Sequence, residues 1–315
     1  PKYAVGAIIV LCLVDMWQVN KRYLNDDMFV ERSVRETPQQ ETATDRQIMQ
    51  DKAPDYRVLN LASNTFNENE TSYYHKSIGG YHAAKLRRYQ EMIDQYIGKE
   101  MRNMQGAIVN AQGDMTRVAG DSIYPVLNML NTKYVILPLQ GGQTAPLLNP
   151  YAFGNAWFVE RISYVDNANA EIDAVGKIDL HHEAVADSKF KDALGEPTAH
   201  QSTAVVTLKK YEPNELTYTV ESQKGGIVVF SEIYYPGWTA TVDGAATPVG
   251  RVNYILRAIN VKPGKHTVVL TFKPASVKNT ETAAYVAYLL LVLAIAAGVF
   301  FEMKRRKNET NELKK

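Results

Sequence analysis

The chain has 315 residues, of which 45% are hydrophobic and 22% charged, and its formal net charge is +1. This composition is typical of a folded protein and excludes a largely disordered chain. The nearly neutral charge gives no reason to expect a nucleic-acid partner, because binding nucleic acid usually requires a strongly basic face. The single cysteine, Cys12, excludes an internal disulfide and a metal site built from cysteines.

Residues 1–22 predict a membrane helix. Residues 3–14 are apolar, Asp15 interrupts the run, and Trp17 precedes two basic residues as at a membrane interface. A secretory signal peptide is the rival interpretation, but no small-residue cleavage site follows. Because the run is short for a complete span and the chain starts with proline, we interpret residue 1 as a truncation point within a longer protein.

Residues 23–200 predict an extracytoplasmic α/β region. Alternation predicts a strand over 56–62, and residues 121–139 predict a short helix followed by a strand over 133–137. A further strand over 156–165 and a helix over 167–175 complete a small α/β layer. His181, His182 and Glu183 lack the spacing of metal ligands, so a turn before a short strand is the favoured interpretation and no metal site is assigned.

The stretch over residues 72–90, SYYHKSIGGYHAAKLRRYQ, combines tyrosines, histidines and basic residues around two glycines. Leu86, Tyr89 and Ile93 recur at helical spacing, which predicts a helix that begins near residues 81–83. Free N–H groups at such a helix start bind phosphate. The predicted site for an anionic lipid phosphate or a glycan consists of His75, Lys76, Gly79, Gly80, His82, Lys85 and Arg88. In the alternative, the tyrosines pack inward, the glycines form a turn and the basic residues form a solvated face.

Residues 201–277 predict an antiparallel β-sandwich, because short β-rich runs alternate with turn signals every 8 to 14 residues. Asp243 and Gly244 predict a hairpin turn. Trp238 is a candidate for stacking on a sugar. The alternative, which we favour, is that Trp238 starts a strand and covers the sandwich.

Residues 282–302 predict a second membrane helix, since 283–301 contain no charge and span about 28 Å at 1.5 Å per residue. The basic cluster at 304–307 predicts a cytoplasmic tail over 303–315. The expected fold is therefore a membrane-anchored α+β protein, with an extracytoplasmic α/β layer and a β-sandwich flanked by two transmembrane helices.

Five motifs occur in order over nearly the whole chain: SYYHKSIGGYHAAKLRRYQEMID, LNMLNTKYVI, NPYAFGNAWFV, YYPGWTATVDG and NYILRAINVKPGKHTVVLTF. Together they resemble the C-terminal part of the YfhO family of bacterial membrane proteins, especially members from Bacteroidetes-like bacteria. The resemblance implies a polytopic protein of the bacterial inner membrane that is similar to GT-C glycosyltransferases. Such enzymes transfer a sugar from a polyprenyl-phosphate carrier, here to an envelope glycan or lipid.

Catalytic residues are not assigned within this chain. In GT-C enzymes the acidic catalytic residue usually lies in the first extracytoplasmic loop, and no motif here matches it. The chain also lacks the common nucleotide-binding, zinc-protease and serine-hydrolase motifs, and its sequence indicates no particular cofactor. We therefore expect the chain by itself to be inactive. The alternative is a non-catalytic, membrane-tethered module that binds carbohydrate or assists envelope assembly.

Overall fold

The computed structural model describes residues 2–29, 31–32, 40–111, 118, 123–196 and 204–312. The chain divides into two compact units, Pro1–Gln50 and Asp51–Lys315. The first unit contains helix α1 (Lys2–Tyr23), a 3₁₀ turn η1 (Asp26–Met28) and helix α3 (Ala43–Ile48). Helix α3 begins with a capping box, in which the Thr42 hydroxyl accepts from the Asp45 N–H and the Asp45 carboxylate accepts from the Thr42 N–H.

Two segments are long and apolar enough to cross a membrane, namely Tyr3–Met28 and Ala275–Lys307, and neither is buried against protein. The first contains α1, and the second is the greater part of helix α9 (Ala275–Glu312). Both predicted apolar helices are therefore present, and each is long enough to cross a membrane. Helix α9 begins several residues before the predicted start at 282, because the polar residues 275–281 continue the helix outward from the apolar run.

The α/β region of the second unit is built on a four-stranded sheet in the order β2-β1-β3-β4. Its strands are β1 (Arg57–Asn60), β2 (Lys76–Ser77), β3 (Thr132–Pro138) and β4 (Thr144–Leu148). Strand β1 is parallel to β2 and β3, whereas β4 returns antiparallel to β3 through the short turn η5 (Gln140–Gly142). The strands predicted over 56–62 and 133–137 are confirmed, and the predicted α/β layer is present.

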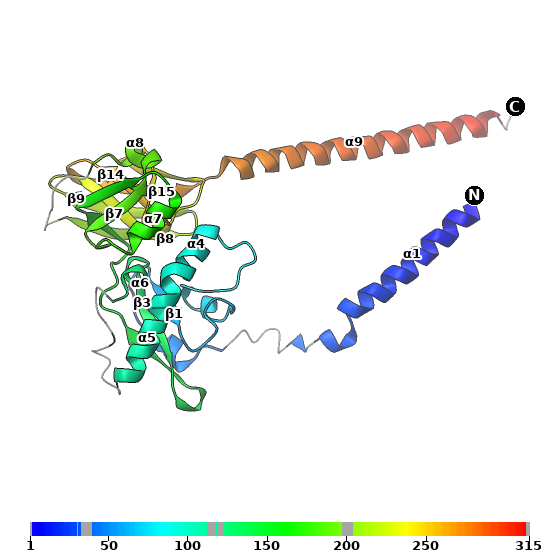
Figure 1. Cartoon of the computed structure of the whole chain (residues 1–315). Helices are drawn as coiled ribbons and strands as arrows, with labels where there is room; N and C mark the ends of the chain where they lie inside the picture. Colours follow the sequence, from blue (N-terminus) through cyan, green and yellow to red (C-terminus); the bar gives the residue numbers. More distant parts are fainter. Residues whose placement is uncertain are drawn as a thin grey trace. The chain divides into compact units, whose positions relative to one another are not determined.

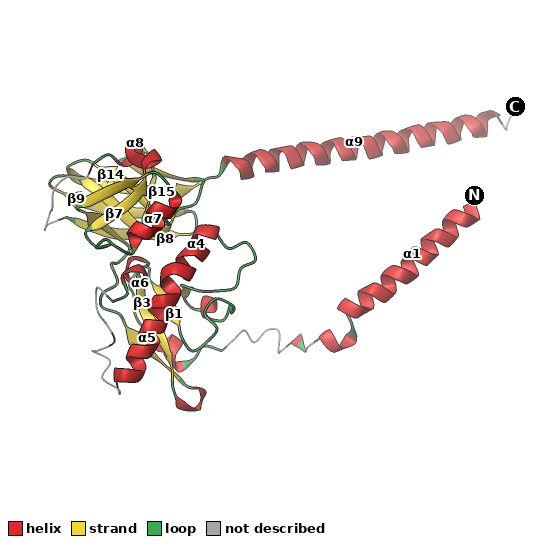
Figure 2. Ribbon diagram, viewed as in Figure 1, coloured by secondary structure: helices red, strands yellow, loops and turns green. Residues whose placement is uncertain are grey.

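Three helical segments lie end to end beside β1 and β3 and form one continuous rod, residues 87–111 (Figures 1 and 2). The segments of the rod are α4 (Arg87–Met92), a π-helical turn η3 (Ile93–Ile97) and α5 (Gly98–Ala111). The short helix α6 (Pro125–Met129) follows them in the chain. The apolar face of the rod buries Met92, Ile97 and Met104 in the main core. Helix α6 lies within the predicted segment 121–139, of which residues 121 and 122 lie outside the described part of the chain.

The helix predicted to begin near residues 81–83 begins at Arg87 instead, so this prediction was wrong. The backbone N–H groups of Gly80 and Tyr81 donate to the carbonyls of Thr65 and Glu68, at 2.7 and 3.0 Å. A short 3₁₀ turn, η2 (Thr71–Tyr73), lies between these two loop segments. Contacts between the two loop segments hold this part of the backbone out of the helical conformation, and helical spacing in the sequence does not reveal such contacts.

A β-sandwich occupies the C-terminal part of the second unit. One sheet has the order β12-β11-β15-β9-β8 and the other β13-β14-β10-β5. The strands are β5 (Ala156–Val159), β8 (Val205–Glu212), β9 (Glu215–Ser222), β10 (Gly226–Ile233), β11 (Trp238–Val242), β12 (Ala245–Thr247), β13 (Gly250–Val252), β14 (Leu256–Val261) and β15 (Gly264–Phe272). All pairings within these two sheets are antiparallel, as predicted.

Strand β10 is buried on both faces. Val228 and Phe230 lie in the core between the two sheets, whereas Ile227 and Val229 lie in the main core that the sheet shares with the α/β region. A strand covered on both sides carries a continuous apolar run, which explains GIVVF at its start. The second sheet is thus the middle layer of the unit, since its outer face packs on the α/β elements.

The elements on that outer face are the parallel pair β6 (Arg161–Val165) and β7 (Glu183–Asp187), helix α7 (Ala168–Val175), the turn η6 (Ser188–Phe190) and helix α8 (Lys191–Leu194). The strand predicted over 156–165 is therefore two strands, of which β5 joins the sandwich and β6 does not. The predicted domain boundary between residues 200 and 201 lies outside the described residues. Strand β5 shows that the sandwich also uses chain from before that boundary.

Candidate ligand-binding cleft

The basic residues of the predicted site over 72–90 point to different partners. Lys76 forms an ion pair with the Asp55 carboxylate and lies over the Tyr211 ring, and burial lowers the pKa of its ammonium. Lys85 lies over the Phe66 ring, with its ammonium 5.4 Å from the ring centre. His75 is buried, and the Nδ1 atom of the exposed His82 accepts the N–H of Ala84 at 3.0 Å. These side chains are not gathered around the glycine pair, so binding of an anion there remains a prediction.

Gly79 and Gly80 allow two loop segments to approach closely. A Cβ atom on Gly79 would lie 1.8 Å from the Thr65 carbonyl oxygen, and Gly80 has a φ of +104°. The Gly79 N–H donates to the Ser77 hydroxyl at 3.0 Å, and the Gly80 N–H donates to the Thr65 carbonyl. The N–H groups of the glycine pair, which the sequence predicted to bind phosphate, therefore donate to groups within the protein. The two glycines form a turn, as in the alternative interpretation of this stretch.

Arg88, a member of the predicted set, lines a cleft. The cleft has a volume of about 410 Å³ and lies between the start of α4, the loop after β10 and the turn from β13 to β14. Its lining consists of Leu86, Arg87, Arg88, Tyr89, Ile233, Tyr234, Tyr235, Pro236, Arg251, Tyr254 and Ile255. The wall is thus mainly aromatic and aliphatic, with three arginines and no carboxylate among these residues. Such a lining suits a ligand with an apolar or sugar-like face and a negative group.

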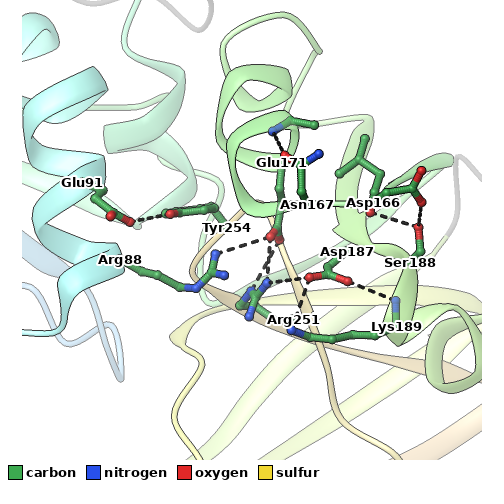
Figure 3. A network of polar contacts seen from close by, with 12 residues as sticks. Arg88, Glu91, Asp166, Asn167, Glu171, Asp187, Ser188, Lys189, Arg251 and Tyr254 are labelled. Atoms are coloured by element: carbon green, nitrogen blue, oxygen red, sulfur yellow. Dashed lines mark hydrogen bonds and ion pairs between the residues drawn. The ribbon is translucent and has the colours of Figure 1, made fainter.

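A buried carboxylate contacts two of the three lining arginines, Arg88 and Arg251 (Figure 3). Glu171, on α7, is fully buried, and its Oε2 atom accepts from Arg251 Nη2 at 2.7 Å. Arg88 Nη1 approaches the same oxygen from α4, at 3.4 Å. The Asp187 carboxylate lies 3.8 Å from Arg251 Nη2 and 3.2 Å from the Lys189 ammonium. Arg251 thus pairs with both carboxylates. Arg88 is a second cation at Glu171, and Lys189 is a second cation at Asp187.

Tyr254 supports Arg88 from the other side. The Arg88 guanidinium carbon lies 4.2 Å from the centre of the Tyr254 ring, and the Tyr254 hydroxyl donates to the Glu91 carboxylate. That hydrogen bond is the main reason why the pKa of Glu91 is lowered. Burial, together with Glu91, raises the pKa of Tyr254 to about 12, so the phenol keeps its proton at neutral pH.

The turn that carries Tyr254 has an unusual backbone. Asn253 and Tyr254 both have positive φ, at 48° and 70°, which is costly for a bulky residue. Asn253 is completely buried and bonded to β7: its side-chain oxygen accepts from the Val185 N–H at 3.0 Å, and its own N–H donates to the Val185 carbonyl at 2.7 Å. These bonds hold the turn in the conformation that presents the Tyr254 ring to the cleft.

Trp238 lies at the start of β11 and packs on the core between the two sheets. The Arg257 guanidinium carbon lies 3.8 Å from the centre of its ring, and the Phe272 ring centre lies 5.4 Å away. The tryptophan thus covers the sandwich, as in the interpretation favoured from the sequence. Stacking of a sugar on Trp238 remains untested.

A second, more polar cavity of about 620 Å³ includes His181 and His182. The His181 ring stacks on Phe153 with ring centres 4.7 Å apart, and His182 Nδ1 lies 2.8 Å from a Glu160 carboxylate oxygen. Among the residues that the structure describes, no group of three histidine, cysteine, aspartate or glutamate side chains is placed to hold a metal ion. The two histidines have aromatic and carboxylate neighbours instead.

Comparison with known families gives a match to the part of the chain that supplies the sandwich side of the cleft. Residues 176–281 match the family model of the bacterial membrane protein YfhO. This match confirms the predicted family resemblance for residues 176–281, and the resemblance of the preceding motifs stays a prediction. No curated protein and no solved structure matches the chain. The YfhO-matching segment includes Tyr234, Tyr235, Arg251 and Tyr254 of the cleft, whereas Arg88 lies outside it.

Arg251, Tyr254 and Glu171 were not identified from the sequence as site residues. Glu171 lies 83 residues after Arg88 and 80 residues before Arg251, and no short motif joins the three. The sequence feature that could have drawn attention to Tyr254 was the motif NYILRAIN. This motif contributed to the family resemblance, but it did not indicate that Tyr254 contacts Arg88.

Proposed function

We propose that this chain is the C-terminal part of a polytopic, YfhO-type glycosyltransferase-like protein of the bacterial inner membrane. In this proposal the protein transfers a sugar from a polyprenyl-phosphate carrier to an envelope glycan or lipid, and its catalytic residues lie in a preceding part of the protein. Residues 51–274 face the outside and help to position the carrier or the acceptor. The observation that supports a ligand-handling role is the cleft, whose lining includes four tyrosines and three arginines.

The cleft also supports the alternative of a membrane-tethered module that binds carbohydrate without catalysis. Its described lining contains no carboxylate that could serve as a general acid or base, whereas aromatic rings and arginines suffice for binding. Sugar transfer distinguishes the two functions. We expect none from residues 1–315 in membranes supplied with a polyprenyl-phosphate sugar and an envelope extract, and we expect transfer from the longer protein in the same assay. A longer protein that binds glycan but never transfers sugar would favour the binding module.

The contribution of the basic stretch is tested in the longer protein. Lys85→Ala combined with Arg88→Ala should raise the KM for the lipid-phosphate donor in a salt-sensitive manner, because it removes Arg88 from the cleft lining and a second cation three residues before it. Unchanged KM and kcat in this double variant would identify the stretch as scaffold.

Membrane orientation is tested with single cysteines. In a Cys12→Ser background, Asn214→Cys lies in the turn between β8 and β9 and Asn311→Cys lies near the end of α9. In intact cells, a thiol reagent that cannot cross membranes should label the cysteine at position 214 and should not label the cysteine at position 311. Equal labelling of both cysteines would contradict the proposed orientation.

A further inference from the structure

The cleft lies next to the point where the chain enters α9. The Lys273 N–H donates to the Gly237 carbonyl at 3.0 Å, and a Cβ atom on Gly237 would lie 2.9 Å from Pro274 Cβ. The Tyr235 ring lies 6.1 Å from the Phe272 ring, measured between centres. Because Tyr235 and Pro236 also line the cleft, one wall of the cleft is fixed to the last residues before the membrane helix.

The distance to the bilayer follows from the helix. Eight residues, 275–282, of which most are polar, separate the start of α9 from the uncharged run at 283–301, and they span about 12 Å at 1.5 Å per residue. The polar layer on each side of a bilayer is about 5–8 Å thick, from the difference between total and hydrocarbon thickness. A headgroup that projects beyond the first phosphate therefore extends toward the segment that joins the cleft wall to α9.

Arg88 is free to bind an anion without leaving a buried charge unpaired. Its side chain is 32% exposed and lies 3.4 Å from Glu171, whereas Arg251 is 7% exposed and holds the same carboxylate at 2.7 Å. When Arg88 turns toward a ligand, Arg251 continues to compensate Glu171, so the large cost of an isolated buried carboxylate does not arise. Arg251 is the buried cation of the pair, and Arg88 is the partly exposed one.

We propose that the cleft binds the distal phosphate of an outer-leaflet lipid whose headgroup carries that phosphate on a sugar or another polyol. Arg88 contacts the phosphate, and the tyrosines of the loop after β10 contact the polyol. The proposal relies on the membrane anchoring in the proposed function and is independent of sugar transfer. The arginines of the lining, which contains no carboxylate, supply cationic donors for the phosphate, and the attachment of the cleft wall to α9 favours a lipid over a soluble source.

The test uses the 315-residue chain in phosphatidylcholine nanodiscs. The probe lipids are phosphatidylinositol 4-phosphate, which carries a distal phosphate on a polyol ring, and phosphatidylinositol, which lacks it. An environment-sensitive dye on Leu86→Cys, in a Cys12→Ser background, reports occupancy of the cleft, and native mass spectrometry of the unlabelled chain counts retained probe lipid. We expect preferential binding of the 4-phosphate lipid. Arg88→Ala should weaken that binding about tenfold or more, as for loss of a charge-assisted contact.

Arg161→Ala is the matched control. It removes the same charge from an exposed pair with Glu183 that does not line the cleft, so binding should be unchanged. Equal binding of the two lipids, equal losses in the two arginine variants, or no binding by either measurement would overturn the proposal. So would equally strong binding of soluble inositol 1,4-bisphosphate.

The same lipid assay separates this inference from the proposed function. If the longer protein transfers sugar but shows no Arg88-dependent lipid preference, the inference fails and the proposed function stands. If the longer protein shows an Arg88-dependent lipid preference but transfers no sugar, the inference stands and the proposed function fails.

Discussion

Glu100 should make the stability of the α/β region depend on pH. Its side chain is buried, and its two carboxylate oxygens accept the N–H groups of Val126 and Leu127 at the start of α6, at 2.9 and 2.8 Å. Burial raises the pKa of Glu100 from 4.5 to about 7, against the opposing effect of these two hydrogen bonds. The native state therefore holds a proton on Glu100 at a pH where the unfolded chain has lost it.

The direction and size of the effect follow from linkage. Between pH 4.5 and 7 the native state binds more protons than the unfolded state, so the free energy of unfolding falls as the pH rises. The contribution is complete below pH 4.5 and is lost as the pH passes through 7. At about 1.4 kcal/mol per pKa unit, the shift corresponds to about 3 kcal/mol at most.

The perturbation is Glu100→Gln, which keeps the size of the side chain and removes the titration. Urea unfolding of the chain in nanodiscs, followed by tryptophan fluorescence from pH 4.5 to 8, should give a smaller fall in unfolding free energy for this variant than for the native protein. Gln105→Ala, at an exposed position on the same helix, should parallel the native profile. Parallel profiles for Glu100→Gln and the native protein would refute the reasoning.

Two further predictions use the same unfolding assay. Gly79→Ala should destabilise the chain by about 2 kcal/mol or more through overpacking, whereas Gly106→Ala, with open space on α5, should stabilise it by about 0.5–1 kcal/mol; equal effects would contradict the close approach at Gly79. Arg251→Met should cost about 3 kcal/mol because it weakens the compensation of buried Glu171, and adding Glu171→Gln should restore part of the loss. A double variant no more stable than Arg251→Met alone would show that the buried charge is not the cause.

Local patterns in the sequence were sufficient for the elements that depend on nearby residues. The uncharged run at 283–301 predicts a membrane helix because its length matches a bilayer core, and the structure has α9 there. Asp243 and Gly244 predict a hairpin turn because both positions require positive φ, and they have φ values of 51° and 82° between β11 and β12. In each case the physical cause lies within the segment itself.

The tertiary structure decided what depends on contacts between distant segments. Helical spacing placed the start of α4 too early, because a loop around Thr65 captures the N–H groups that follow Gly79. The stretch over 72–90 indicated basic residues but not their partners, and of the seven site residues predicted there only Arg88 lines the cleft described here. It does so because folding brings α4, α7 and the turn at Tyr254 together around the buried carboxylate of Glu171, across sequence separations that no periodicity records.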